Sequence, residues 1–305
     1  MSENLTKLFT PQFSTNLELK LQQMGSKLRD TVSTGSHVGK MASPIQQINP
    51  IKAKRPAGRF APKDRTDADF VRRWVFPVDG EIDQLIDSFD ELKTIVDPKS
   101  QYTVNAANAV GRDYDDEIIA AATRDSYIGT DANALTTESF VTASYRIADN
   151  FGASAATGLT VAKLIELKRL YRHNEVDLDT DPATLIIGSK QESDLLNQAQ
   201  VVSTEFNDKP VLVDGVLTRF MGFNIKVMER LPTYTTNTRG VLSYVKSGIY
   251  LGIWKDMTNR VSIRNDLSGE PYDLYTAYSM GATRTQPGKV YQIACLDSTG
   301  AAITP

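Results

Sequence analysis

Three stretches of the chain carry side chains whose types and spacing could do chemistry. The first, Asp177-Leu-Asp179-Thr-Asp181, begins as a calcium-binding loop does, with alternate carboxylates that could converge on one hard cation. Pro182 replaces the glycine that such a loop requires, however, and Gly188 stands where a bidentate glutamate belongs. We therefore expect a solvated acidic loop here and no calcium site.

The second stretch, Gly35-Ser-His-Val-Gly39-Lys40-Met41, is similar to a phosphate-binding P-loop. It is one residue shorter than that motif, and Met41 occupies the position of the magnesium-binding serine or threonine. No strand followed by a helix frames it. We therefore expect no phosphate site at these residues.

The third stretch places four carboxylates on a predicted helix, namely Asp113, Asp115, Asp116 and Glu117. Carboxylates this close could act as general acid and general base, or could hold a metal ion. No histidine, second carboxylate motif or glycine-rich loop accompanies them. We interpret the group as the acidic face of a helix.

Cysteine and histidine are too scarce for most metal and nucleophilic sites. Cys295 is the only cysteine, which excludes an internal disulfide and a thiolate cluster, and we expect it to be a small buried side chain in a strand. His37 and His173, the only histidines, lie far apart in sequence. Serine-nucleophile and dinucleotide motifs are also absent. The sequence predicts no catalytic residue, no metal ligand and no cofactor, so we do not expect an enzyme.

A run of cations with a single aromatic residue, Phe60, is the remaining candidate site. It consists of Lys52, Lys54, Arg55, Arg59, Lys63 and Arg65. Nucleic-acid-binding segments usually interleave aromatic residues with the cations or place the charge on a helix face. We therefore expect the run to contact the acidic surface of a protein partner. A nucleic-acid-binding module that uses this basic arm is the alternative.

The charge of the whole chain is divided unevenly. Of 34 Lys and Arg and 37 Asp and Glu, residues 1–65 hold 11 and 4, a net charge of +7. The rest holds 23 and 33, a net charge of −10. A basic arm on an acidic body favours association between identical copies, because each arm finds a complementary surface on the next copy.

The elements around the basic run explain why it needs a partner. Large apolar residues are sparse from Asp30 to Thr66, and repeated glycines and prolines argue against helix, so this segment cannot bury a core of its own. We expect two extended arms, one at 37–48 and one at 51–60. Ordering the backbone of such a segment costs about 1–2 kcal/mol of conformational free energy per residue. Contacts with a neighbouring chain could offset this cost.

The rest of the chain alternates helix and strand patterns. Helices are predicted at about 79–96, 102–123 and 160–172 from apolar spacings of three and four, and a Ser189-x-x-Glu192 capping box starts another. Strands are predicted at 70–77, 139–147, 184–188, 223–227, 241–245, 249–254, 261–263, 272–283 and 290–295. Helices followed by a mostly β C-terminal third indicate the α+β class.

Several stretches, in their order along the chain, resemble the major capsid proteins of tailed phages, over about residues 11–296. They are Pro11-Gln-Phe-Ser-Thr-Asn16, Arg72-Arg-Trp-Val-Phe-Pro-Val-Asp79, Leu85-Ile-Asp-Ser-Phe-Asp90, Gly111-Arg-Asp-Tyr-Asp-Asp-Glu-Ile-Ile-Ala-Ala121 and Leu185-Ile-Ile-Gly-Ser-Lys190. The resemblance implies an N-terminal arm at 1–30 and an extended β-hairpin loop at 31–75. It further implies a peripheral domain with a long spine helix at 76–155 and 257–286, and an axial domain with a C-terminal strand at 156–256 and 287–305.

The resemblance also implies function and partners. Copies of the chain would form hexamers and pentamers of an icosahedral head shell around double-stranded DNA, bound without sequence specificity. A portal protein and a decoration protein would be further partners, and an encapsulin-like compartment of the same fold is the alternative shell. The N-terminal arm is too short for the helical scaffolding segment of some members, so a separate scaffolding protein is expected. No lysine of the loop matches the crosslinking motif of other members.

The sequence also predicts where the protein is found. Met1-Ser2-Glu3-Asn4-Leu5 lacks the pattern of a signal peptide, and no apolar run approaches the length of about 20 residues that spans a bilayer. We therefore expect assembly in the host cytoplasm, a final location in the virion and no membrane partner.

Overall fold

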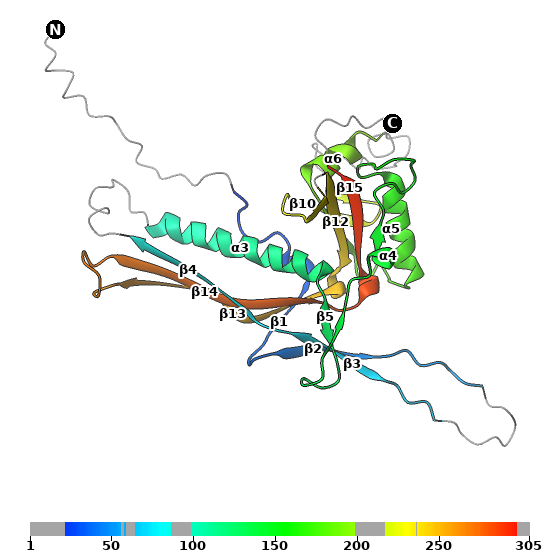
Figure 1. Cartoon of the computed structure of the whole chain (residues 1–305), viewed down its shortest axis with the longest axis horizontal. Coiled ribbons are helices and arrows are strands. Elements are labelled where there is room, and N and C mark those ends of the chain that lie inside the picture. The colour runs from blue at the N-terminus through cyan, green and yellow to red at the C-terminus, as the bar shows by residue number, and fades with distance from the viewer. Residues whose placement is uncertain are drawn as a thin grey trace, which may run out of the picture. The chain divides into compact units, whose positions relative to one another are not determined.

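The computed structural model describes residues 22–55, 58, 65–86, 99–198, 217–235 and 237–297 (Figure 1). Its α-helices are α3 Lys99–Thr123, α4 Thr142–Tyr145, α5 Val161–His173 and α6 Ser189–Leu196. Its strands are β1 Ser33–Ser36, β2 Ala42–Ile48, β3 Phe70–Val75, β4 Val78–Ile86, β5 Ser126–Ile128, β6 Thr136–Glu138, β7 Arg146–Ile147, β8 Ala183–Ile187, β9 Arg219–Phe220, β10 Phe223–Val227, β11 Thr233–Thr235, β12 Thr238–Val245, β13 Ile249–Ile263, β14 Tyr272–Arg284 and β15 Val290–Leu296.

The chain forms two compact units. One comprises Met1–Ser26, Asp79–Asp113 and Lys255–Ser279, and the other comprises Lys27–Val78, Tyr114–Trp254 and Met280–Pro305. The helices and mixed sheets confirm the predicted α+β class. Among the described residues, no helix is both long enough and apolar enough to cross a bilayer.

A seven-stranded sheet with α5 forms the main core of the second unit. Its order is β7-β15-β12-β8-β10-β9, with β11 paired to β12. Every residue of β8 is buried, which explains the unbroken apolar run of this strand. Helix α5 begins after Thr160, whose side chain accepts the backbone N–H of Lys163 at 3.4 Å, and it buries Leu164 and Leu167 against the sheet. The predicted helix 160–172 and strand 184–188 are confirmed.

The start of α6 differs in detail from the prediction. The cap residue is Gly188, not Ser189, and the backbone N–H of Gly188 donates to Gln191 Oε1 at 3.1 Å. This is one half of a capping box, because glycine has no side chain to complete it. The backbone N–H of Ser189 donates to Glu229 Oε1 at 2.6 Å instead. A carboxylate from the loop after β10 therefore takes the role that the sequence assigned to Glu192.

The predicted helix at 79–96 is wrong over its first part. Residues 78–86 form strand β4, and residues 87–96 lie outside the described part of the chain. Side chains of β4 alternate between exposed and covered, so Ile82 and Ile86 satisfy a two-residue period as well as the helical spacing of four. Gly80 also fits a strand here, because a Cβ at this position would lie 2.2 Å from the Tyr278 ring.

The long helix and the C-terminal strands agree well with the sequence. Helix α3 runs from Lys99 to Thr123, three residues longer at its start than predicted, and buries Val110, Tyr114 and Ile118 as expected. The two stretches predicted at 249–254 and 261–263 belong to one 15-residue strand, β13. The strands predicted at 223–227, 241–245, 272–283 and 290–295 are confirmed as parts of β10, β12, β14 and β15.

The extended segment before residue 78 is a two-stranded ribbon. β2 and β3 pair antiparallel, with Ala42 opposite Val75 and Ile48 opposite Phe70 (Figure 1). The returning strand is therefore 70–75 and not the predicted arm at 51–60. Aromatic and β-branched residues make 70–75 the better strand, whereas residues 51–55 have no regular structure. Arg59 and Phe60 lie outside the described residues.

The predicted strand at 139–147 is largely absent. The structure places β6 just before it, a short helix α4 at Thr142–Tyr145, and only two strand residues, Arg146 and Ile147, at its end. The alternation of Phe140, Val141 and Tyr145 with small residues suits either conformation. Here Tyr145 stacks near Tyr291 of β15, with ring centroids 5.9 Å apart. Packing against the sheet therefore decides against a longer strand.

Cys295 is fully buried in β15, as predicted. Burial raises the pKa of its thiol to about 12, whereas an unfolded thiol has a pKa of about 8.5. The folded state thus keeps a proton that the unfolded state releases, and the resulting stability is present below about pH 9 and lost as the pH rises further.

This burial predicts a pH-dependent effect of Cys295→Ala. Between pH 7 and pH 10, the free energy of unfolding should fall by about 1.5–2 kcal/mol more for the parent chain than for the variant. Urea unfolding followed by tryptophan fluorescence at the two pH values measures this difference. Equal losses for both chains would show that the thiol ionises freely in the folded state.

Candidate subunit interface

The predicted basic residues lie at the open end of the β2–β3 ribbon. Lys52, Lys54 and Arg55 follow β2, Arg65 precedes β3, and all four side chains are exposed. Arg59 and Lys63 lie outside the described residues. Within the part of the chain that the structure describes, none of the four exposed cations forms an ion pair or hydrogen bond. Their charge is free to attract an acidic surface.

Uncovered apolar side chains accompany these cations. Ile48 is 62% exposed, its cross-strand partner Phe70 is 57% exposed, and Ile51 is 62% exposed. Three large apolar side chains next to several cations form a mixed surface of the kind that protein partners cover. We call residues 48–55, 65 and 70 the ribbon tip.

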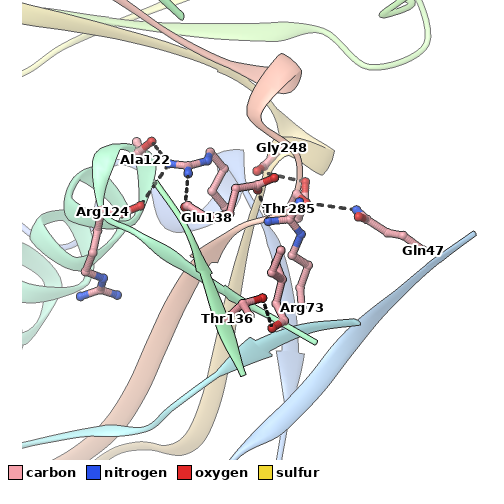
Figure 2. Close-up of polar contacts among 10 residues, drawn as sticks. Gln47, Arg73, Ala122, Arg124, Thr136, Glu138, Gly248 and Thr285 are labelled. Carbon is pink, nitrogen blue, oxygen red and sulfur yellow. Dashed lines mark hydrogen bonds and ion pairs between the residues drawn. The ribbon is translucent and has the colours of Figure 1, made fainter. Parts of the chain in front are cut away.

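A buried arginine on β14 lies at the junction to which the ribbon is attached. Arg284 is 0% exposed and its guanidinium donates to the backbone oxygens of Ala122 at 3.0 Å, Arg124 at 3.1 Å and Glu138 at 3.1 Å (Figure 2). The first two carbonyls belong to the end of α3, where helical carbonyls have no partner within the helix. Burial lowers the pKa of Arg284. One side chain thus holds α3, β6 and β14 together.

Two further contacts attach the ribbon to this junction. Arg73 of β3 is buried and forms an ion pair with Glu138 of β6. Gln47 Nε2 of β2 donates to the backbone oxygen of Thr285 at 3.1 Å (Figure 2). The Thr285 hydroxyl in turn donates to Ser247 O at 2.7 Å. Both strands of the ribbon are therefore tied to the folded body, β3 at Arg73 and β2 at Gln47, which directly precedes Ile48.

The outer strands of the same small sheet also brace the ribbon. The sheet has the order β2-β3-β5-β6, and Trp74 Nε1 of β3 donates to Gly129 O at 3.0 Å. The rings of Phe76 and Tyr127 meet edge to face with centroids 5.1 Å apart. Trp74 and Phe76 belong to the aromatic run that predicts a strand at 70–77, and β3 confirms this strand over residues 70–75.

The carboxylates of α3 are structural, and more specific than an acidic face. Asp115 is fully buried and accepts the backbone N–H groups of Lys27 and Leu28, both at 3.0 Å. Asp116 pairs with Arg230 at the surface. The remaining two also have fixed partners: Asp113 accepts the Tyr278 hydroxyl at 2.8 Å, and Glu117 accepts Arg124 Nη2 at 2.6 Å and the backbone N–H of Ala282 at 3.2 Å.

The burial of Asp115 predicts that substitutions at Asp115 and at Asp116 differ strongly in their effect on the free energy of unfolding. Asp115→Asn removes the charge and turns an N–H group toward a backbone donor, which should cost about 2–3 kcal/mol of unfolding free energy. Asp116→Asn removes only a surface ion pair and should cost less than about 1 kcal/mol. Urea unfolding of both variants tests the pair. Similar losses for the two would contradict the anchoring role of Asp115.

The acidic loop at 177–181 and the stretch at 35–41 both make contacts within their own chain. Asp177 Oδ1 accepts the backbone N–H of Asp179 at 3.1 Å, and Asp181 accepts that of Ser247 at 3.2 Å, which matches the predicted acidic loop. Gly35 and Ser36 belong to β1, which pairs with β13. Across the described ranges, no three His, Cys, Asp or Glu side chains gather in a way that could hold a metal.

Comparison with known proteins identifies the family. The model of the family described as phage capsid protein matches residues 5–297. A search of curated protein sequences gives no match. Among solved structures, the capsid of cyanophage P-SCSP1u is 15% identical, covers 98% of this chain and 97% of that chain, and has a TM-score of 0.75.

Two other structures show the same fold at similar identity. The capsid of cyanophage Pam1 is 12% identical over 96% of this chain and 97% of that chain, with a TM-score of 0.72. The capsid of a native GTA particle is 12% identical over 95% and 96%, with a TM-score of 0.70. Because the family model spans nearly the whole chain and the fold agrees over its full length, the chain belongs to the phage capsid protein family and is a structural protein of an icosahedral phage head.

Proposed function

We propose that copies of this chain bind one another through the ribbon tip to form the hexamers and pentamers of the head shell. The observation that carries this proposal is the contrast along one ribbon. Arg73 and Gln47 of the paired strands are tied to the folded body, whereas Ile48 and Phe70, the last pair of the ladder, remain uncovered. An anchored ribbon that ends in uncovered apolar and cationic side chains is suited to bind a neighbouring molecule.

The proposed domain assignment follows that of tailed-phage capsid proteins. Residues 1–30 would be the N-terminal arm, 31–75 the extended loop, 76–155 and 257–286 the peripheral domain, and 156–256 with 287–305 the axial domain and C-terminal strand. The proposed role is structural and not catalytic. A separate scaffolding protein, a portal protein, a decoration protein and packaged double-stranded DNA complete the set of proposed partners, with assembly in the host cytoplasm.

Substitutions at the ribbon tip test this proposal. Ile48→Asp and Phe70→Asp place a charge on exposed positions, so unfolding free energy should change by less than about 1 kcal/mol, while the yield of shells should fall at least tenfold. Ile165→Asp on α5, where the parent side chain is 55% exposed, is the matched control. The readout is the shell fraction in a sucrose gradient after co-expression with the scaffolding protein.

The outcomes separate folding from association. Loss of shells with unchanged stability, and normal shells from Ile165→Asp, would support the ribbon tip as a contact between copies. Normal shells from both tip variants would contradict it. The alternatives of a nucleic-acid-binding module and a cellular compartment receive no support from the family or from the compared structures.

A further inference from the structure

Strand β4 carries a row of carboxylates on one face. Asp79, Glu81 and Asp83 alternate with covered residues, and all three are exposed. The strand lies at the end of the sheet order β1-β13-β14-β4, so within the described residues no strand pairs with its outer edge. A strand edge without a paired strand, flanked by exposed carboxylates, is a surface that another chain can approach.

The surroundings of this row point to a cationic ligand. Asp83 faces Asp273 of β14, and this contact raises the pKa of Asp83. Asp273 is 9% exposed, and its Oδ1 atom has no hydrogen-bond partner, while Arg264 approaches its other oxygen at 3.6 Å. Two facing carboxylates with one oxygen unsatisfied leave room for an additional cation.

A hollow beside the row could receive an extended basic side chain. Its volume is about 520 Å³, and Asp79, Glu81, Tyr275 and Lys255 contribute to its lining. The Tyr275 hydroxyl donates to Glu81 Oε2 at 3.1 Å, which fixes this carboxylate beside the ring. An aromatic ring next to carboxylates binds cations through both charge and its π face. Lys255 is the one cation of this lining.

We infer that the carboxylate row of β4 receives Lys52 and Lys54 from the ribbon tip of a second copy of this chain. This inference rests on the proposed function and names the surface that the ribbon tip binds. Lys52 and Lys54 are two residues apart, as are neighbouring carboxylates of the row, which β4 places roughly 6.6 Å apart. The segment 51–55 is not part of a strand, so the inference requires it to extend along the row when it binds, and the two sets of charges then match in spacing.

The same charges explain why the contact forms between copies. The basic residues of the tip have no acidic partner in the described part of their own chain, and the acidic row is a feature of the body that carries most of the negative charge. Contacts between exposed charges are individually weak and sensitive to salt. Repetition at every subunit of a shell makes weak contacts sufficient.

A charge exchange tests the inference in the full-length chain. Lys52→Glu with Lys54→Glu, and separately Glu81→Lys with Asp83→Lys, should each reduce the yield of shells at least tenfold. The variant with all four substitutions should return to within about threefold of the parent, because every contact regains opposite charges. Lys226→Glu and Asp179→Lys reverse exposed charges elsewhere and should leave the yield unchanged.

A disulfide test establishes that the contact joins two molecules. Chains with Lys54→Cys and chains with Glu81→Cys, both also carrying Cys295→Ala and different tags, are co-assembled and then oxidised. At a 1:1 mixture we expect a mixed dimer that carries both tags in up to about half of the chains, because half of the neighbours are of the other kind, whereas a pair of Asp179→Cys and Glu81→Cys chains should give none. If the parent chain forms shells but no mixed dimer appears and the fourfold variant does not restore the yield, the contact between Lys52, Lys54 and the carboxylate row is wrong. The proposed function would remain. A parent chain that forms no shells overturns the proposed function itself.

Discussion

Replacing Arg284 with methionine should lower the free energy of unfolding by about 3–5 kcal/mol, because one buried and two partly buried carbonyl oxygens would lose their donor at once. Those carbonyls belong to Ala122, Arg124 and Glu138. Methionine keeps the apolar stem and has no hydrogen-bond donor, so the loss reports mainly the contacts of the guanidinium. Arg284→Lys should cost less than methionine but remain destabilising, since one ammonium lacks the planar fork that reaches carbonyls on two sides.

The effect should also reach the ribbon. Without Arg284, the end of α3 and strand β6 lose their common anchor, and Glu138 no longer supports Arg73 of β3 as firmly. Hydrogen exchange of residues 42–48 and 70–75 should therefore accelerate. Arg124→Ala is the control, because the Arg124 side chain is exposed and makes only an ion pair with Glu117 and one bond to Ala282 O at 3.0 Å, so its loss should cost about 1–2 kcal/mol. A loss below 1 kcal/mol for Arg284→Met would contradict its role as an anchor.

Replacing Lys163 with alanine is the second large expected effect. Lys163 of α5 is fully buried, and its ammonium donates to the backbone oxygens of Thr157 at 3.0 Å, Gly158 at 2.9 Å and Ala294 at 3.1 Å. Burial lowers the pKa of this ammonium. Alanine removes three hydrogen bonds and opens a cavity, and although Thr157 O still accepts the backbone N–H of Leu296 at 2.9 Å, the loss should be about 3–5 kcal/mol in urea unfolding.

Two further variants separate the polar part from the packing part. Lys163→Met fills the space without donating, so it should recover about 1–2 kcal/mol of the alanine loss. Lys168→Met on the same helix removes a single bond to Met221 O at 3.1 Å from a half-buried position and should cost about 1 kcal/mol or less. If Lys163→Met proved as stable as the parent chain, the three carbonyl contacts would contribute nothing.

Much of the regular structure could be predicted because local patterns and tertiary packing agree. The apolar spacing of α3, the unbroken apolar run of β8 and the alternation of β10 each specify one conformation. Strand β4 could not be predicted, because Ile82 and Ile86 fit a helix and a strand equally well. Only neighbouring strands, and the Tyr278 ring against Gly80, decide between the two.

The candidate site was predictable in part. The basic run and the absence of a core around it predict a segment that binds a partner; its four described residues are exposed, and the binding itself stays a prediction. The buried cations could not be predicted, because Arg284 ends an ordinary strand and Lys163 lies within an ordinary helix. Their acceptors are backbone carbonyls far away in sequence, which leave no pattern of residue types. Asp115 is similarly hidden among carboxylates that differ only in their partners.

The most direct test of the shell assignment is electron microscopy of the full-length chain co-expressed with its scaffolding protein. We expect closed icosahedral particles whose subunits cluster in sixes and fives, with the ribbon of each subunit lying on a neighbour. A chain that stays monomeric under these conditions, although it is folded by circular dichroism, would contradict the assignment.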